Sequence, residues 1–198
     1  MLKQVRLMAI ALAAIASLGL NTARGGLITN GGFETGDFTG WTLSGNTSDP
    51  TTYGIDSSFP YAETYNAYFG PQGSLAFLSQ TITTIPGQTY ELDFFLKNEN
   101  GSSANEFSVN FGSTNLYDAT NLSAFDYQQY RYVVTATSTT SVVTLGFQND
   151  FSYFDVDNIS VSSVPEPNSF ICLALGAILL ACHGLRHRLA RENGTVRT

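Results

Sequence analysis

The sequence predicts that the folded part of the chain is an all-β sandwich. Short segments in which apolar and polar residues alternate recur about every ten residues, with turns of glycine, proline and asparagine between them. No useful length of the stretch from Gly26 to Val164 has the apolar period of a helix. One apolar run precedes this stretch and another follows it. We therefore expect a β-domain flanked by an N-terminal signal helix and a C-terminal single transmembrane helix.

The expected strands follow one another from Leu27 to Val161. Residues 49–73 interrupt the series, because three prolines and six aromatic residues there predict a long connection, a kind of segment that often carries binding residues. In the last strand the apolar positions change parity after Val156, which predicts a β-bulge near Asp157-Asn158. The expected strands are residues 27–29, 41–43, 75–82, 90–96, 107–111, 116–117, 130–134, 143–147 and 154–161.

A signal peptide is expected over residues 1–25. Lys3 and Arg6 make the N-terminus positive, and the apolar run 7–20 follows them. Small residues at the end of this segment suit cleavage by a signal peptidase. An uncleaved N-terminal anchor is the alternative. In either case the β-sandwich domain is expected over residues 26–163.

The C-terminal segment 164–191 is expected to contain a transmembrane helix, residues 169–185. Its apolar run from Phe170 to Cys182 carries no charge. A bilayer core about 30 Å thick calls for about 20 apolar residues in a helix, so this helix spans only if flanking charged residues reach the headgroups. A buried helix of a soluble domain is the alternative. The basic residues of this segment follow the apolar run, which predicts a cytoplasmic tail over residues 192–198.

The segment begins with Pro165-Glu166-Pro167 and continues with a short apolar helix and an Arg-rich end, and this order resembles the PEP-CTERM sorting signal of exported Gram-negative bacterial proteins. The resemblance implies an exosortase-like processing protease as partner and an association with exopolysaccharide and biofilm. It also implies transient anchoring in the inner membrane, with the N-terminal domain outside and the C-terminus cytoplasmic, followed by a cell-surface or extracellular location. His187 interrupts the basic cluster, and the chain continues beyond Arg191. The implied sorting residues are Pro165, Glu166, Pro167, Arg186 and Arg188.

The central domain is strongly acidic. Residues 26–164 contain fourteen acidic residues and two basic ones, Lys97 and Arg131, a net charge of −12 against −7 for the whole chain. Because this charge repels phosphates, we expect no nucleic-acid partner. The charge is compatible with divalent cations and with neutral glycans. Both cysteines, Cys172 and Cys182, lie in the C-terminal segment, so the domain has no disulfide framework.

Three pieces of the domain, taken in order, resemble the jelly-roll modules related to carbohydrate-binding modules and galactose-binding-like domains. These pieces are Asn30–Gly36 with Gly40-Trp41, Gln80–Ile82 with Pro86–Tyr90, and Phe154–Val161. Modules of this type often hold a structural calcium between the first and last strands. The resemblance implies Glu34 and Asp157 as calcium ligands, whose carboxylate oxygens suit that ion. Asn158 stands where the family usually has a second acid. Exposed acids without a metal are the alternative.

Polysaccharide binding requires aromatic faces that stack on sugar rings, with polar groups for the hydroxyls. For each aromatic residue the alternative is core packing, which we favour for Trp41. Rings from other loops are Tyr117, Tyr127 and Tyr130. The candidate ligand-binding residues are Trp41, Tyr53, Tyr61 and Tyr65.

Enzymatic activity is not expected. Both histidines, His183 and His187, lie in the C-terminal segment, so the domain cannot form a Ser-His-Asp triad or a histidine zinc site. A glycosidase with two carboxylates is conceivable, but no particular pair is indicated. We therefore predict an exported, exosortase-processed surface or matrix protein whose non-catalytic sandwich binds polysaccharide. The alternatives are a structural matrix protein without a specific ligand and a glycan-active enzyme.

Overall fold

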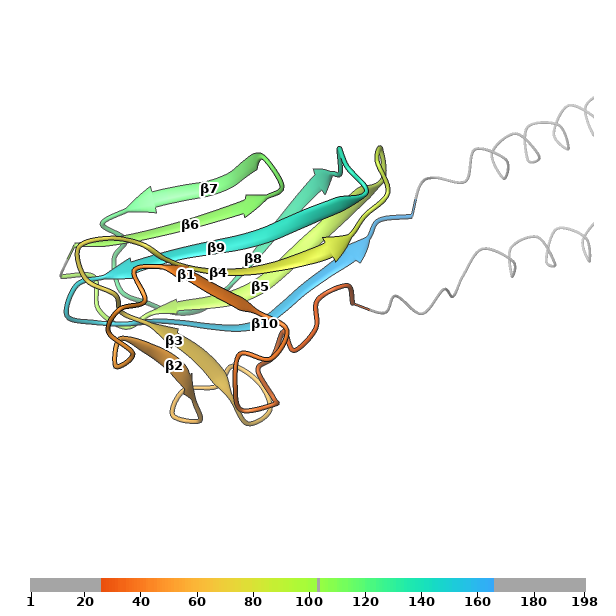
Figure 1. The fold of residues 1–198 in the computed structure, drawn as a ribbon. Coiled ribbons are helices and arrows are strands. Elements are labelled where there is room, and N and C mark those ends of the chain that lie inside the picture. The colour runs from red at the N-terminus through yellow and green to blue at the C-terminus, as the bar shows by residue number, and fades with distance from the viewer. Residues whose placement is uncertain (1–25, 103, 166–198) are drawn as a thin grey trace, which may run out of the picture.

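The computed structural model describes residues 26–102 and 104–165, which form a sandwich of two five-stranded antiparallel sheets (Figure 1). The described residues contain ten strands and no helix. The strands are β1 (Thr42–Gly45), β2 (Tyr53–Asp56), β3 (Asn66–Phe69), β4 (Ala76–Thr83), β5 (Thr89–Asn98), β6 (Asn105–Phe111), β7 (Thr114–Thr120), β8 (Phe125–Thr135), β9 (Thr140–Asn149) and β10 (Phe154–Ser163). One sheet has the order β1-β4-β9-β6-β7 and the other β2-β3-β10-β5-β8.

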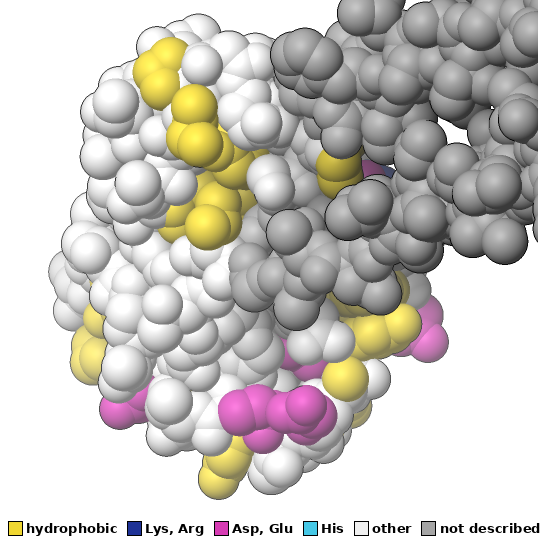
Figure 2. Space-filling model, turned by 90° about the vertical axis from the view of Figure 1, so that its right-hand side faces the viewer, with side chains coloured by type: hydrophobic (Ala, Val, Ile, Leu, Met, Phe, Trp, Pro, Cys, Tyr) yellow, Lys and Arg dark blue, Asp and Glu magenta, His cyan; other side chains and the backbone are white. Residues whose placement is uncertain are grey.

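The two ends of the described chain emerge at the same end of the sandwich (Figure 1). The amide of Leu27 donates to the carbonyl of Val161 at 2.9 Å, which joins the first described residues to β10. Viewed from this end, acidic side chains and separate hydrophobic patches are visible (Figure 2). Among the described residues no helix is long and apolar enough to cross a membrane. The expected signal peptide, the expected helix 169–185 and all the sorting residues except Pro165 lie outside the described residues.

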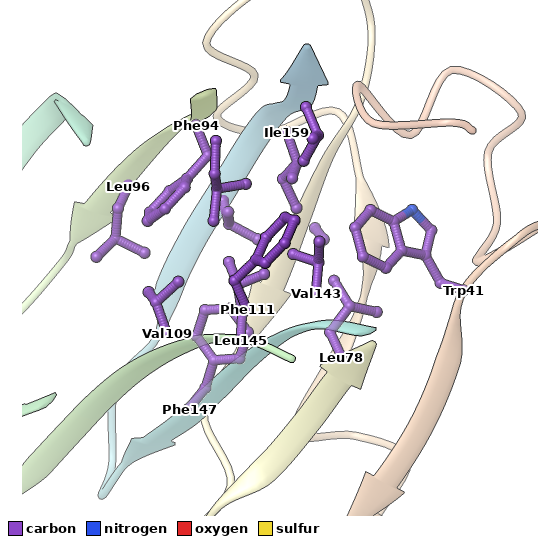
Figure 3. Close-up of a cluster of buried hydrophobic side chains, with 14 of the residues drawn as sticks. Trp41, Leu78, Phe94, Leu96, Val109, Phe111, Val143, Leu145, Phe147 and Ile159 are labelled. Atoms are coloured by element: carbon purple, nitrogen blue, oxygen red, sulfur yellow. The ribbon is translucent and has the colours of Figure 1, made fainter. Parts of the chain in front are cut away.

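The apolar core lies between the two sheets (Figure 3). Alternation places Leu92, Phe94 and Leu96 of β5 on the inner face, where none of them is exposed. Phe69 of β3 stacks on Phe147 of β9 with ring centroids 4.3 Å apart, a contact that joins the sheets. Each such buried side chain contributes roughly 1.5–3 kcal/mol to folding. The strands that bury these residues therefore turn their alternate residues outward.

The strands expected from residue 75 onward are confirmed, with small differences at their ends. The expectation that residues 49–73 form only a connection is wrong, because β2 and β3 lie within them and pair with each other. Each has only four residues, too few to show a period of two. Gly54 and Asp56 also belong to residue types that are depleted in strands.

The strand expected over residues 27–29 does not form. The Gln80 side chain binds Thr29 instead: its Oε1 accepts from the Thr29 amide at 2.7 Å, and its Nε2 donates to the Thr29 carbonyl at 3.0 Å. These two bonds satisfy both backbone polar groups, so Thr29 needs no neighbouring strand.

The bulge expected near Asp157-Asn158 is confirmed. The register of β10 against β5 shifts between Asp157 and Ser160, and Asn158 has a φ of 52°. Asparagine adopts this left-handed conformation more readily than most residues. The extra residue keeps both Val156 and Ile159 in the core, at 0% and 2% exposure.

Candidate functional site

The outward side of the β2-β3-β10-β5-β8 sheet, called the outer face below, carries a dense set of aromatic and charged side chains. Its position follows from the core, because residues next to inward-facing ones point outward. Asp155 pairs with Lys97 across β10 and β5, and Phe95 pairs with Gln129 across β5 and β8. The outward residues of strands β3, β10, β5 and β8 include Tyr68, Asp93, Phe95, Lys97, Tyr127, Gln129, Arg131, Asp155 and Asp157.

Residues 57–65, called the covering loop below, fold over part of this face and are held by two carboxylates. Asp157 Oδ2 accepts from the amides of Tyr61 and Ala62 at 3.0 and 3.1 Å. Glu34 Oε1 accepts from the amides of Thr64 and Tyr65 at 3.1 and 2.9 Å. Hydrogen bonds to an ionised acceptor are stronger than neutral ones. The two carboxylates thus hold residues 61–65, the second half of the covering loop.

Glu34 and Asp157 lie close to each other. A Cβ on Gly32 would lie 3.7 Å from Asp157 Oδ1 and 3.8 Å from Glu34 Cγ, with Asn158 Oδ1 at 3.2 Å. Burial raises the pKa of Asp157 to about 6; the loop amides oppose this shift, and the nearby Glu34 adds to it. Within the described residues, no three acidic, histidine or cysteine side chains form a metal-binding group. The oxygens of Glu34, Asp157 and Asn158 are nevertheless the hard donors that calcium prefers, so this donor set fits the ion.

Two aromatic rings, those of Tyr61 and Phe95, form a stack on the outer face. The ring of Tyr61 lies on that of Phe95, with centroids 3.6 Å apart and planes 13° from parallel. Tyr127 of β8 meets Tyr61 edge-on at 5.4 Å and donates its hydroxyl to the carbonyl of Phe59 at 2.7 Å. Burial raises the pKa of Tyr127, so its hydroxyl stays protonated as a donor. Tyr61 remains 44% exposed although it stacks on Phe95.

Lys97 stands beside this stack in a small network of charges. Its Nζ lies 3.2 Å from Asp155 Oδ2, 3.6 Å from Glu99 Oε1 and 3.7 Å from the ring centre of Phe59. Asp155 Oδ1 accepts from Asn66 Nδ2 at 3.0 Å. Burial raises the pKa of Asp155 to about 7, although the Lys97 ammonium acts in the opposite direction. Asp155 therefore changes charge near neutral pH.

Two hollows flank this network. The first has a volume of about 300 Å³, and the second is wider and more open at about 460 Å³. Both are lined in part by Glu99, so they adjoin at that residue. Three aromatic rings and three carboxylates dominate the lining of the first hollow: Phe59, Tyr68, Tyr153, Asp56, Glu99 and Asp155. The lining of the second includes Lys97, Asn98, Phe125 and Asp126.

The structure separates the four candidate aromatic residues. Trp41 is 8% exposed, packs on Phe33 and donates its Nε1 hydrogen to the Asn30 carbonyl at 3.0 Å. The core-packing alternative is therefore confirmed for Trp41. Tyr53 points inward and stacks on Phe69. Tyr65, the last residue of the covering loop, is partly buried and packs against the core. Only Tyr61 of the four presents its ring on the outer face.

Several site residues were not among the candidates, namely Phe59, Phe95, Tyr68, Tyr153, Lys97 and Asp155. Phe95 alone leaves a signal in the sequence. It is a large apolar residue at an outward position of a strand whose inward positions are already apolar.

The sequence matches no protein-family model, and the curated proteins also contain no match. Its fold is nevertheless similar to that of several solved structures. TmCBM61 in complex with β-1,4-galactotriose has a TM-score of 0.57 at 15% identity, over 71% of this chain and 99% of that one. The CBM22-1 xylan-binding domain from Paenibacillus barcinonensis Xyn10C has a TM-score of 0.53 at 12% identity, over 74% of this chain and 99% of that one.

A third similar structure is the enzymatically active domain of Bacteriophage CBA120 tailspike protein 4. It has a TM-score of 0.55 at 15% identity, over 70% of this chain and 21% of that one. At such low identity these likenesses show the fold alone. The chain shares its two-sheet sandwich fold with these carbohydrate-binding modules, in agreement with the fold that the three sequence pieces imply.

Proposed function

We propose that this protein binds polysaccharide on the outer face without catalysing a reaction. The observation that carries the proposal is the half-exposed ring of Tyr61, which is held flat by Phe95. A fixed aromatic surface loses little conformational entropy when a sugar ring stacks on it. Such ligand sites combine apolar surfaces with a few placed polar groups, and the outer face offers both.

The shape of the site favours a chain over a single sugar. Two hollows adjoin at Glu99, and the aromatic stack stands beside them. A chain of several sugars can therefore cross Lys97 and Glu99 while one ring rests on Tyr61. The similar modules named above include one solved with β-1,4-galactotriose and one described as xylan-binding, which supports the same class of ligand.

Retention on insoluble polysaccharides and titration with soluble ones test this proposal. The panel should include galactan, xylan and the exopolysaccharide of the native host. Tyr61→Ala is expected to weaken binding about tenfold or more, the effect of losing roughly 1.4 kcal/mol. Tyr61→Phe keeps the ring and is the matched control, with nearly unchanged affinity. If no glycan is retained, the structural matrix protein becomes the better description.

The absence of catalysis is part of the proposal. A glycoside hydrolase requires one protonated and one ionised carboxyl group on opposite sides of the bond that is cut. Asp155 is a carboxyl group that holds a proton near neutral pH, but Asn66 and Lys97 occupy its two oxygens. It is therefore not free to donate a proton to a leaving group. New reducing ends after incubation with any bound glycan would contradict a purely binding role.

We also propose that Glu34 and Asp157 bind a structural calcium ion. The supporting observation is that the Asp157 carboxylate, the Glu34 side chain and the amide oxygen of Asn158 all lie around Gly32, although Glu34 is far from the other two in the sequence. Calcium would offset the unfavourable burial of Asp157 and would fix the covering loop. The melting temperature should fall by several degrees when a chelator is added. An unchanged melting temperature, together with no calcium in the purified protein, would rule the ion out.

We further propose that the protein is exported and processed at the sorting motif, as the resemblance implies. Val164 is bonded to the sandwich: its amide donates to the carbonyl of Thr89, and its carbonyl accepts from the Gln88 side chain. Pro165, the first residue of the motif, follows it directly and is exposed, which suits access by a protease. Mass spectrometry of the protein from its native host gives both mature ends. An intact C-terminus there would contradict processing.

A further inference from the structure

We propose that the smaller hollow on the outer face selects sugars carrying a free, protonated amine, so that the preferred polysaccharide contains glucosamine-type residues without N-acetyl groups. The hollow, called the acidic aromatic pocket below, is lined by Phe59, Tyr68, Tyr153, Asp56, Glu99 and Asp155. This inference rests on the proposed function and specifies its substrate class. The pocket volume of about 300 Å³ is at the small end of the range for ligand sites, which suits one sugar unit.

The protein already holds one ammonium group at the wall of this pocket. Lys97 Nζ lies over the ring of Phe59 and within 4 Å of the carboxylates of Glu99 and Asp155. An aromatic face together with carboxylates is the environment that stabilises an ammonium ion, through cation–π attraction and charge-assisted hydrogen bonds. Lys97 thus serves as an internal example of the chemistry that the pocket accepts.

Lys97 does not neutralise the pocket. Of the three acidic side chains that line it, Asp155 is largely protonated at pH 6.5, because burial raises its pKa to about 7. Asp56 and Glu99 remain, and they outnumber the single positive charge of Lys97. Within residues 26–102 and 104–165, Asp56 forms no ion pair, and its Oδ1 accepts only from the amide of Ser58, at 3.1 Å. An uncharged sugar leaves Asp56 without a counter-charge, whereas an ammonium group supplies one. The expected contact of the ligand amine is therefore with Asp56.

Two further rings complete the pocket. Tyr68 meets Tyr153 edge-on, with centroids 5.4 Å apart. Tyr68 lies against Gly54, where a Cβ would come within 2.6 Å of its hydroxyl oxygen. Gly70 likewise leaves space for Tyr153, since a Cβ there would lie 2.7 Å from a ring carbon. Because these two glycines have no side chain, the two rings can pack close to the backbone and line the pocket with Asp56, where each can offer its π-electrons to a cation.

The rest of the domain disfavours an acidic glycan. Of its two basic residues, Lys97 is paired as described above. Arg131 is also paired, through Nη2 to Asp93 at 2.8 Å and through Nε to Glu91 at 3.7 Å. A uronate or sulfate would meet uncompensated negative charge, whereas an amino sugar meets charge of the opposite sign.

The test compares two matched ligands on the full-length chain. Calorimetric titration uses a glucosamine trimer and an N-acetylglucosamine trimer at pH 6.5 and fixed ionic strength. The free amine is expected to bind about tenfold more tightly, and Asp56→Asn is expected to remove most of this preference. Asp118 is an exposed acid on β7 of the other sheet. Asp118→Asn makes the same charge change away from the pocket, so this variant should keep the preference for the free amine. Tyr153→Ala, which removes one ring of the pocket, should reduce the preference for the free amine independently of Asp56→Asn.

The outcomes separate this inference from the proposed function. Equal affinity for both trimers, with neutral polysaccharides still retained and still dependent on Tyr61, overturns the amine preference alone. No binding of any glycan overturns both proposals. If spermidine binds as tightly as the glucosamine trimer, or if Asp118→Asn weakens binding as much as Asp56→Asn, the attraction is that of an acidic surface for any polycation, and the pocket is not selective.

Discussion

Tyr61 and Phe95 form the tightest aromatic contact on the outer face, with centroids 3.6 Å apart, although one belongs to the covering loop and the other to β5. The contact depends on residues from two other places in the chain, β10 and β8. Asp157 accepts a hydrogen bond from the amide of Tyr61. Tyr127 meets the ring of Tyr61 edge-on and donates its hydroxyl to the carbonyl of Phe59. The proposed sugar-stacking ring is therefore positioned by the sheet.

Phe95→Ala is predicted to weaken glycan binding about tenfold, even though Phe95 lies beneath the stacking ring. Tyr61 would lose the surface that keeps it flat, and restoring its position on binding would cost conformational entropy. Stability should fall by only about 1 kcal/mol, because the pair lies on the outer face and such pairs contribute about 0.5–1.5 kcal/mol. Titration with glycan and urea denaturation measure the two effects. A large loss of stability with unchanged affinity would show that Phe95 acts only in folding.

Asp157→Asn is predicted to release the covering loop. Oδ1 of Asp157 accepts from Asn158, and Oδ2 accepts from Tyr61 and Ala62. An asparagine has one acceptor oxygen, so at least one of these amides would face an NH₂ group, at a cost of about 1–3 kcal/mol. Hydrogen exchange at the Tyr61 and Ala62 amides should become faster, while the core strands stay protected. Glu63→Gln makes the same charge change in the loop and should leave these amides protected.

Gly31→Ala is predicted to destabilise the protein by about 3 kcal/mol or more, a loss typical of a disrupted core. A Cβ at this position would lie 1.9 Å from the carbonyl oxygen of Ile159, a backbone atom that cannot turn away. The Gly31 carbonyl also accepts from the Ile159 amide at 2.9 Å, so the substitution separates the segment carrying Glu34 from the β10 bulge. Denaturant midpoints measure the loss. Gly26→Ala, which meets nothing within 4 Å, is the control and should have little effect.

The sequence predicts those parts of the fold that depend on local pattern. Alternation identifies β5 and β9, and the parity change places the bulge of β10 at Asp157. Alternation cannot tell which strands are neighbours. The order β3-β10-β5 brings Asp155 beside Lys97, and no local pattern contains that pairing. The covering loop is also a tertiary result, because its position depends on distant carboxylates binding its amides.

The free energy of unfolding is predicted to fall as the pH rises from about 5 to about 8. Burial raises the pKa of Asp155 to about 7 and that of Asp157 to about 6, from an ordinary value of 3.8. A carboxyl group with a raised pKa binds more protons in the folded state than in the unfolded one, so its contribution to stability is complete below about pH 4. That contribution is lost as the pH passes through the raised values, by at most about 1.4 kcal/mol per pH unit for each group.

Urea denaturation at several pH values measures this slope. Asp155→Asn stays neutral at every pH and should flatten the fall up to about pH 7, the range in which folded Asp155 holds a proton that the unfolded chain has released. Asp118→Asn on the other sheet should leave the slope unchanged. If calcium binds Glu34 and Asp157, adding it should stabilise the protein most at high pH, because the ion competes with protons for Asp157. A stability that rises steadily from pH 5 to pH 8 without added metal would contradict the burial of both carboxyl groups.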